Sequence, residues 1–188
     1  HILSNAMLEN MVDTNDEWIT ARTGIKERRI LKENGKGTSY LAINAAKDLI
    51  NKAKLDPSTI DLVIVATATP DMKAASTASF TATAIGAFNA FSFDMDSACS
   101  GFLFGMSTAA SYIESGRYKK ILLIGADKMS SIVNYKDRTT CIIFGDGAGA
   151  ALFEPNFDGL GIQDQYLRTD GSGRDFLQAT YGGSSNPI

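Results

Sequence analysis

The chain has 188 residues, a net charge of −3 and 44% hydrophobic residues. That length and hydrophobic content suffice for one domain with a substantial core. Lysine and arginine are scattered, which argues against nucleic acid as the main partner. The apolar runs are too short to cross a membrane, no secretory signal is present, and no His and Cys cluster suits a metal. We therefore expect a cytoplasmic protein without membrane insertion, bound metal or disulfides.

Strand-like and helix-like segments alternate along the chain. Apolar spacing predicts helices over 39–54, over 76–87, and from 102 to about 116. Runs that are apolar, or that alternate apolar with polar residues, predict strands over 61–67, 91–96, 120–125, 140–144 and 148–153. This order predicts an α/β fold with a mostly parallel five-stranded sheet flanked by helices.

The two ends of the chain differ from this pattern. Residues 1–3 lead quickly into a helix-like stretch, which leaves no room for an opening strand. The last residues, from about 171 to 188, have the composition of a loop. We therefore expect one α/β unit over residues 1–170, followed by a loop over 171–188 that leads to an absent second half.

Cys99 is the candidate nucleophile, because it lies between a predicted strand and a predicted helix within Asp96-Ser97-Ala98-Cys99-Ser100-Gly101-Phe102. A helix N-terminus favours a thiolate, and its backbone N–H groups can stabilise an oxyanion. A strand-to-helix turn is also a known way to expose a reactive atom. The alternative is a buried cysteine that acts as a small hydrophobe. Cys141, in an apolar run, is interpreted in that second way, and His1 is the only histidine.

Two other segments carry candidate binding residues. Trp18 and Arg22 share a face if 16–25 is helical, and such a pair can stack on an adenine ring. Spacing alone favours the alternative, in which Trp18 packs on the core and Arg22 forms a salt bridge. Arg138 follows Asp137 in a polar loop and could meet a phosphate. Gly145-Asp146-Gly147 lies between two predicted strands and indicates a hairpin turn rather than a nucleotide loop.

Taken together, four segments resemble signatures of the β-ketoacyl-acyl-carrier-protein synthase III family. They are 11–19, Arg22-Thr23-Gly24-Ile25, 97–102 and 144–150, in the family's order and spacing. The resemblance implies a thiolase-like fold of two similar α/β halves, of which this chain holds only the first, in a homodimer. It identifies the parent protein as an acyltransferase that starts fatty acid synthesis.

The resemblance also implies roles for single residues. Cys99 would take a short acyl group, acetyl above all, from coenzyme A as a thioester, and its backbone N–H would form part of an oxyanion hole. Malonyl-acyl-carrier protein would then lose CO₂ and condense with that thioester. Trp18 and Arg138 would flank the adenine of coenzyme A, and Arg22 and Thr14 would lie near its phosphate and pantetheine. No cofactor is expected beyond the coenzyme A thioester, which is a substrate.

The chain departs from the family pattern in two ways. The family's His and Asn belong to the second half, so this chain alone is expected to be inactive. Ala74 and Ala75 stand where the family has Phe-Pro, which would widen the acyl pocket. Two alternatives therefore stay open: a related condensing enzyme with a longer or different primer, and a non-catalytic half-protein that binds coenzyme A and needs a partner chain.

Overall fold

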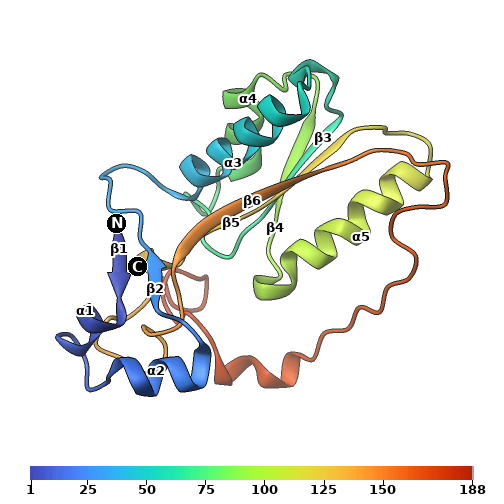
Figure 1. Cartoon of the computed structure of the whole chain (residues 1–188). Helices are drawn as coiled ribbons and strands as arrows, with labels where there is room; N and C mark the ends of the chain where they lie inside the picture. The colour runs from blue at the N-terminus through green and yellow to red at the C-terminus, as the bar shows by residue number, and fades with distance from the viewer. Residues whose placement is uncertain (188) are drawn as a thin grey trace.

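The computed structural model describes residues 1–187 and has two parts, a layered α/β unit and a smaller N-terminal assembly (Figure 1). No helix in this described range combines the length and hydropathy needed to cross a membrane.

A four-stranded mixed sheet forms the centre of the α/β unit. Its order is β4-β3-β5-β6, with β3 parallel to both β4 and β5, and β6 antiparallel to β5. The strands are β3 (Leu62–Ala66), β4 (Phe91–Met95), β5 (Ile121–Lys128) and β6 (Asp146–Phe153). The carboxyl ends of β3, β4 and β5 therefore meet at one edge of the sheet.

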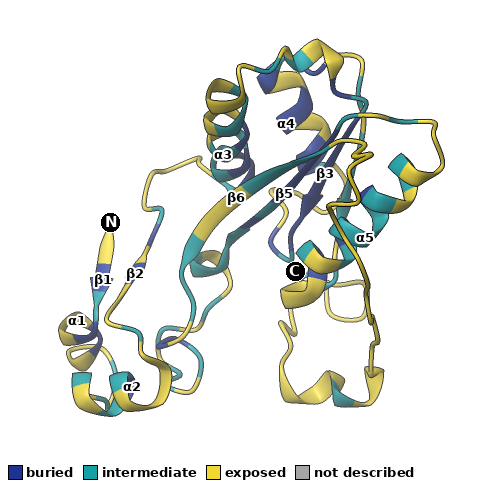
Figure 2. Ribbon diagram, turned by 45° about the vertical axis from the view of Figure 1, so that its right-hand side comes forward, coloured by how far each residue is buried: buried dark blue, intermediate teal, exposed yellow. Residues whose placement is uncertain are grey.

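Helices cover both faces of this sheet. Because side chains alternate along a strand, Val63 and Val65 face α3 (Thr38–Ala53) and α4 (Thr77–Ile85), whereas Leu62 and Ile64 face α5 (Gly101–Glu114). Figure 2 shows the strands β3 and β5 as the most buried part of the molecule. Burial on both faces explains why their sequences are continuously apolar rather than alternating. The α/β class and the predicted helices are thus confirmed.

The N-terminal assembly contains a second, two-stranded sheet. β1 (Ile2–Ser4) and β2 (Glu27–Arg29) pair antiparallel, and α1 (Asn5–Glu9) and α2 (Asp16–Thr23) lie between them in the chain. The expectation that no strand fits at the start was wrong, because three residues suffice when the partner is a nearby short strand. β1 does not enter the main sheet.

The predicted strand over 140–144 is also wrong, and the main sheet has four strands among the described residues instead of five. Residues 139–143 form turns, and the buried Cys141 and Ile142 pack with Leu3, Leu8 and Ile19 in the N-terminal core. A short apolar run does not reveal whether it pairs in a sheet or only fills a core. Consequently β6 pairs with β5, and Gly145-Asp146-Gly147 is not a hairpin turn.

Three short 3₁₀ helices connect elements of the α/β unit: η1 (Pro57–Thr59), η2 (Ala98–Ser100) and η3 (Met129–Ser131). After β6 the chain is irregular and largely exposed, with a fourth 3₁₀ helix, η4 (Gly171–Phe176). The boundary predicted at residue 170 stays a prediction, and Ile188 lies outside the described residues.

Candidate active site

Cys99 lies in a tight turn between β4 and α5. Strand β4 ends at Met95, η2 holds Cys99, and α5 begins at Gly101. The thiol is free and its residue is exposed, as a nucleophile requires. Ala98, immediately before it, has a φ of 44°, a left-handed conformation that non-glycine residues rarely adopt. Such strain costs about 1–3 kcal/mol and is found preferentially at functional turns.

Close packing against β3 holds this turn in place. A Cβ atom added at Gly101 would lie 3.3 Å from the Cβ atom of Ala66, so glycine lets α5 begin close to the end of β3. The next residue along, Thr67, donates its backbone N–H to the carbonyl of Met95 at 3.1 Å. The cap residue Ser100 makes no side-chain hydrogen bond to α5. The first N–H groups of the helix therefore remain available to a developing oxyanion beside the thiol.

Asp127 anchors the β3 end of this arrangement. Its Oδ1 accepts hydrogen bonds from the Thr67 hydroxyl at 3.1 Å, the Ala68 N–H at 2.9 Å, and the N–H and hydroxyl of Thr69 at 3.2 and 2.9 Å. One carboxylate oxygen thus organises the turn that supports the base of the Cys99 loop. The sequence alone did not indicate this role of Asp127.

Cys141, the second cysteine, has the opposite environment. It is fully buried, and this burial raises the pKa of its thiol, with the nearby Asp137 carboxylate raising it further. A buried thiol that resists ionisation is inert. The prediction that Cys141 packs in the core is confirmed, although in a turn rather than a strand.

The candidate nucleotide-binding residues gather around the Trp18 ring. The guanidinium carbon of Arg22 lies 4.3 Å from the ring centroid and that of Arg138 lies 4.7 Å from it. Arg138 also forms an ion pair with Asp13 at 3.3 Å. Trp18 is half-buried against the N-terminal core, so it both packs and stacks. The sequence alternative placed a salt bridge at Arg22. In the structure Arg138 forms the salt bridge, and the guanidinium of Arg22 lies over the Trp18 ring.

Local sequence explains how α2 presents this ring. The side chain of Asn15 caps the helix by accepting the N–H of Trp18 at 2.7 Å, and Gly24 ends it with a φ of 71°. Trp18 and Arg22 are therefore one helical turn apart on one face. Thr14 precedes the cap, and its buried hydroxyl has no hydrogen-bond partner among residues 1–187.

Both groups of residues lie at the same edge of the sheet. Cys99 follows the carboxyl end of β4, and the segment with Arg138 follows the carboxyl end of β5. Figures 1 and 2 show α2 and the start of α5 beyond this end of the sheet. Ligands of open α/β sheets bind at such an edge.

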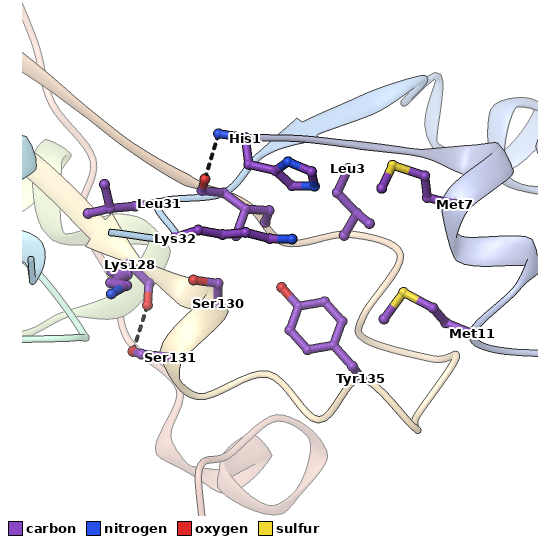
Figure 3. Close-up of a pocket in the computed structure, with 11 residues that line it drawn as sticks. His1, Leu3, Met7, Met11, Leu31, Lys32, Lys128, Ser130, Ser131 and Tyr135 are labelled. Carbon is purple, nitrogen blue, oxygen red and sulfur yellow. Dashed lines mark hydrogen bonds between the residues drawn. The ribbon is translucent and has the colours of Figure 1, made fainter. Parts of the chain in front are cut away.

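A separate pocket of about 420 Å³ opens beside the N-terminal assembly (Figure 3). Leu3, Met7, Met11 and Tyr135 form much of its wall, with His1 above them, and the N-terminal ammonium of His1 donates to the carbonyl of Ile30 at 2.9 Å. Neither Cys99 nor Trp18 lines this pocket. It is therefore distinct from the site described above.

Comparison with known proteins identifies the family. The family model described as 3-oxoacyl-[acyl-carrier-protein (ACP)] synthase III matches residues 93–171, which include Cys99 and Arg138. A β-ketoacyl-[acyl-carrier-protein] synthase III of Bacteroides thetaiotaomicron is 57% identical over 187 residues, covering 100% of this chain and 56% of the relative. One of Chlorobaculum tepidum is 53% identical over 188 residues, covering 99% and 57%.

Solved structures give the same picture. A 3-oxoacyl-[acyl-carrier-protein] synthase III from Aquifex aeolicus superposes with a TM-score of 0.81 at 47% identity, covering 84% of this chain and 51% of that one. A β-ketoacyl-[acyl-carrier-protein] synthase III from Thermus thermophilus gives a TM-score of 0.87 at 38% identity, covering 92% and 53%.

The fold and the thiol-bearing turn place this chain among α/β proteins of the thiolase fold. Within that class, the chain belongs to the β-ketoacyl-acyl-carrier-protein synthase III family. It spans about half the length of the curated relatives it matches, 56% of the Bacteroides protein.

Proposed function

We propose that this chain supplies the acyl-accepting thiol and the coenzyme A subsite of a β-ketoacyl-acyl-carrier-protein synthase III. The single observation that carries the proposal is the free, exposed Cys99 at a strained turn beside the N-terminus of α5. The chemistry that membership of this family implies gives that thiol a defined task. The match to relatives along the whole chain supports it further.

The first step is acyl transfer. The Cys99 sulfur attacks the thioester carbonyl of an acyl-CoA, acetyl-CoA above all, while the backbone N–H groups near Cys99 stabilise the oxyanion. The carbon–sulfur bond to coenzyme A then breaks, and the leaving thiolate takes the proton that the Cys99 thiol gave up. No metal or redox cofactor takes part.

The second step is decarboxylating condensation. Malonyl-acyl-carrier protein loses CO₂, and the resulting enolate carbon attacks the acyl-Cys99 carbonyl. A carbon–carbon bond forms and the bond between the acyl carbon and the Cys99 sulfur breaks. Cys99 leaves as the thiolate and takes a proton from solvent, and 3-oxoacyl-acyl-carrier protein is released, which starts a fatty acid chain. The His and Asn that promote this step belong to a second half in a homodimeric parent protein.

The nucleotide end of coenzyme A is assigned to the cluster on α2. The adenine stacks between Trp18 and Arg138, while Arg22 and Thr14 contact phosphate and pantetheine groups. The gathering of both guanidinium groups at the Trp18 ring supports this assignment, with the Arg138 guanidinium moving off the ring to admit the adenine.

Intact-mass measurement tests the proposal. The natural full-length protein is incubated with acetyl-CoA and then mapped by peptides. We expect one acetyl group on Cys99, its loss in Cys99→Ala, and its retention in the matched Cys141→Ala variant. An acetylated Cys99→Ala protein would overturn the proposal. Absence of any adduct, together with coenzyme A binding by calorimetry, would support the non-catalytic alternative.

A longer primer is the second candidate. Ala74 and Ala75 are small, exposed residues of the loop between β3 and α4, where the family has Phe-Pro. Turnover of acetyl-, butyryl- and octanoyl-CoA discriminates between the two candidates, with Ala74→Phe as the matched variant. A broad primer range that narrows in Ala74→Phe supports the longer primer. A sharp acetyl preference in the unaltered protein counts against it.

A further inference from the structure

Arg28 is a buried cation that the proposed chemistry does not use. Only 4% of the residue is exposed, and burial lowers the pKa of its guanidinium from the usual value. Its hydrogen-bond partners are neutral: the side-chain oxygen of Asn5 and the carbonyl of Ile142, which accepts from both Nε and Nη2. Burying a charge on neutral partners is costly, so such a residue needs a structural reason.

The partners of Asn5 lead to the helix that carries Trp18. Asn5 is 2% exposed, and its amide nitrogen donates to Asp16 Oδ1 at 2.7 Å and to the carbonyl of Ile25 at 2.8 Å. Asp16 is the first residue of α2, and Ile25 follows the Gly24 that ends it. One buried amide therefore holds both ends of α2.

The second partner of Arg28, the carbonyl of Ile142, connects it to the segment that carries Arg138. Ile142 belongs to the same run of turns as Arg138, and the backbone N–H of Cys141 closes that run by donating to the Asp137 carbonyl at 3.1 Å. Close packing reinforces this side, because a Cβ atom added at Gly145 would lie 3.1 Å from the Cβ atom of Arg28. The two walls of the nucleotide subsite are thus joined through the guanidinium of Arg28.

We infer that Arg28 and Asn5 form a buried relay that sets the spacing between the Trp18 helix and the Arg138 segment, and so act as positioning residues for the nucleotide part of coenzyme A. The inference rests on the proposed function. Neither side chain touches the substrate. The relay acts at the nucleotide end, since its links run to α2 and to the Arg138 segment and not to the Cys99 turn.

Acyl donors with and without the nucleotide test this relay. In the natural full-length protein, acylation of Cys99 is measured with acetyl-CoA and with S-acetyl-N-acetylcysteamine, which lacks the nucleotide. Arg28→Lys keeps the charge but not the fork that bridges two partners. We expect its KM for acetyl-CoA to rise about tenfold with kcat within about twofold, and its rate with the truncated donor to stay unchanged.

A second variant and a control complete the design. The Asn5→Asp side chain can still accept a hydrogen bond from Arg28 but loses the donations to Asp16 and Ile25. We therefore expect the same selective rise in the KM for acetyl-CoA. Arg29→Lys, at the exposed neighbouring position on β2, should change nothing. Binding of adenosine 3′,5′-bisphosphate by calorimetry gives a readout independent of activity, and should weaken about tenfold in both relay variants.

The outcomes separate the relay from the proposed function. Two outcomes in folded Arg28→Lys and Asn5→Asp proteins would overturn the relay while leaving the proposed function intact. One is a rate of Cys99 acylation that falls equally with both donors. The other is unaltered binding of adenosine 3′,5′-bisphosphate. If Cys99 of the unaltered protein reacts with neither donor, the proposed function itself fails. Folding of each variant is checked by its thermal melting temperature.

Discussion

Ala98 carries the steric cost of the Cys99 turn. Its φ of 44° places a Cβ atom in the left-handed region, where glycine has no penalty and β-branched residues have the largest. The position of Cys99 between a strand and a helix could be predicted from the sequence, because alternation and helical spacing change there. The backbone strain could not, because alanine usually indicates an ordinary helix or strand.

Substitution of Ala98 measures that strain. We expect Ala98→Val to lower the free energy of unfolding by about 1–3 kcal/mol and to slow alkylation of Cys99 by iodoacetamide. The matched Ala98→Gly variant should stay within about 1 kcal/mol of the unaltered protein, because relief of strain offsets the added freedom of the unfolded chain. Urea unfolding measures both. Equal midpoints for the valine and glycine variants would contradict the strain.

Elements are held together here by specific close approaches. α5 packs on β5 through Gly105, where an added Cβ atom would lie 2.5 Å from the Cδ1 atom of the buried Leu123. The helix and the strand were predictable from periodicity, and the contact between them was not, because it depends on how the two elements cross. For the same reason the apolar run 140–144 was mistaken for a strand.

Gly105→Ala should therefore destabilise the protein despite the higher helix propensity of alanine. Overpacking costs about 1–3 kcal/mol, against about 1 kcal/mol gained from propensity. The double variant Gly105→Ala with Leu123→Val should lose less stability than the sum of the single variants, since valine removes the clashing methyl group. Gly147→Ala, with open space around its added Cβ atom, is the control. Strict additivity would show that the two residues do not meet.

The start of α2 gives a pH-dependent prediction. Hydrogen bonds from Asn5 and then Lys26 hold the pKa of Asp16 below its usual 3.8. The unfolded chain thus binds a proton at higher pH than the folded one, so this stabilisation is complete above pH 3.8 and is lost as the pH falls through the lower folded pKa. We expect the difference in unfolding free energy between the unaltered protein and Asp16→Asn to shrink on acidification below pH 3.8. If the difference in unfolding free energy between the two proteins stayed constant from pH 7 to below pH 3.8, the lowered pKa of Asp16 would be ruled out as a source of stability.

At the scale of the whole molecule, the chain divides at the end of β6. Residues up to Phe153 form the layered unit and the N-terminal assembly, whereas the following segment exposes Phe157, Tyr166, Phe176 and Tyr181 by 77% to 94%. The α/β unit could be predicted from composition and periodicity. The antiparallel position of β6 could not, because it depends on where residues 129–145 pack.

Chymotrypsin digestion of the 188-residue chain tests this division. Cleavage needs an accessible, locally extended backbone, so the first cuts should follow aromatic residues between 157 and 181. Phe88 is an internal control, because its side chain is 76% exposed but its turn is closed by a hydrogen bond from the Ala90 N–H to the Ala87 carbonyl. A first cut after Phe88, identified by mass spectrometry, would contradict the division.

The strand order β4-β3-β5-β6 has a consequence for synthesis on the ribosome. The central pair joins Leu62 to Ile121, and α3 packs on β5 and β6, which are made long after it. The nascent chain can pair β3 with β4 and pack α3 on α4 early, but β3 lacks its second neighbouring strand, and α3 lacks the β5 and β6 surface, until β5 and β6 emerge. Parallel pairing over such a separation is slow. During that interval the continuously apolar β3 is open to wrong associations. The exposure of β3 during synthesis is thus set by the order of the strands in the sheet.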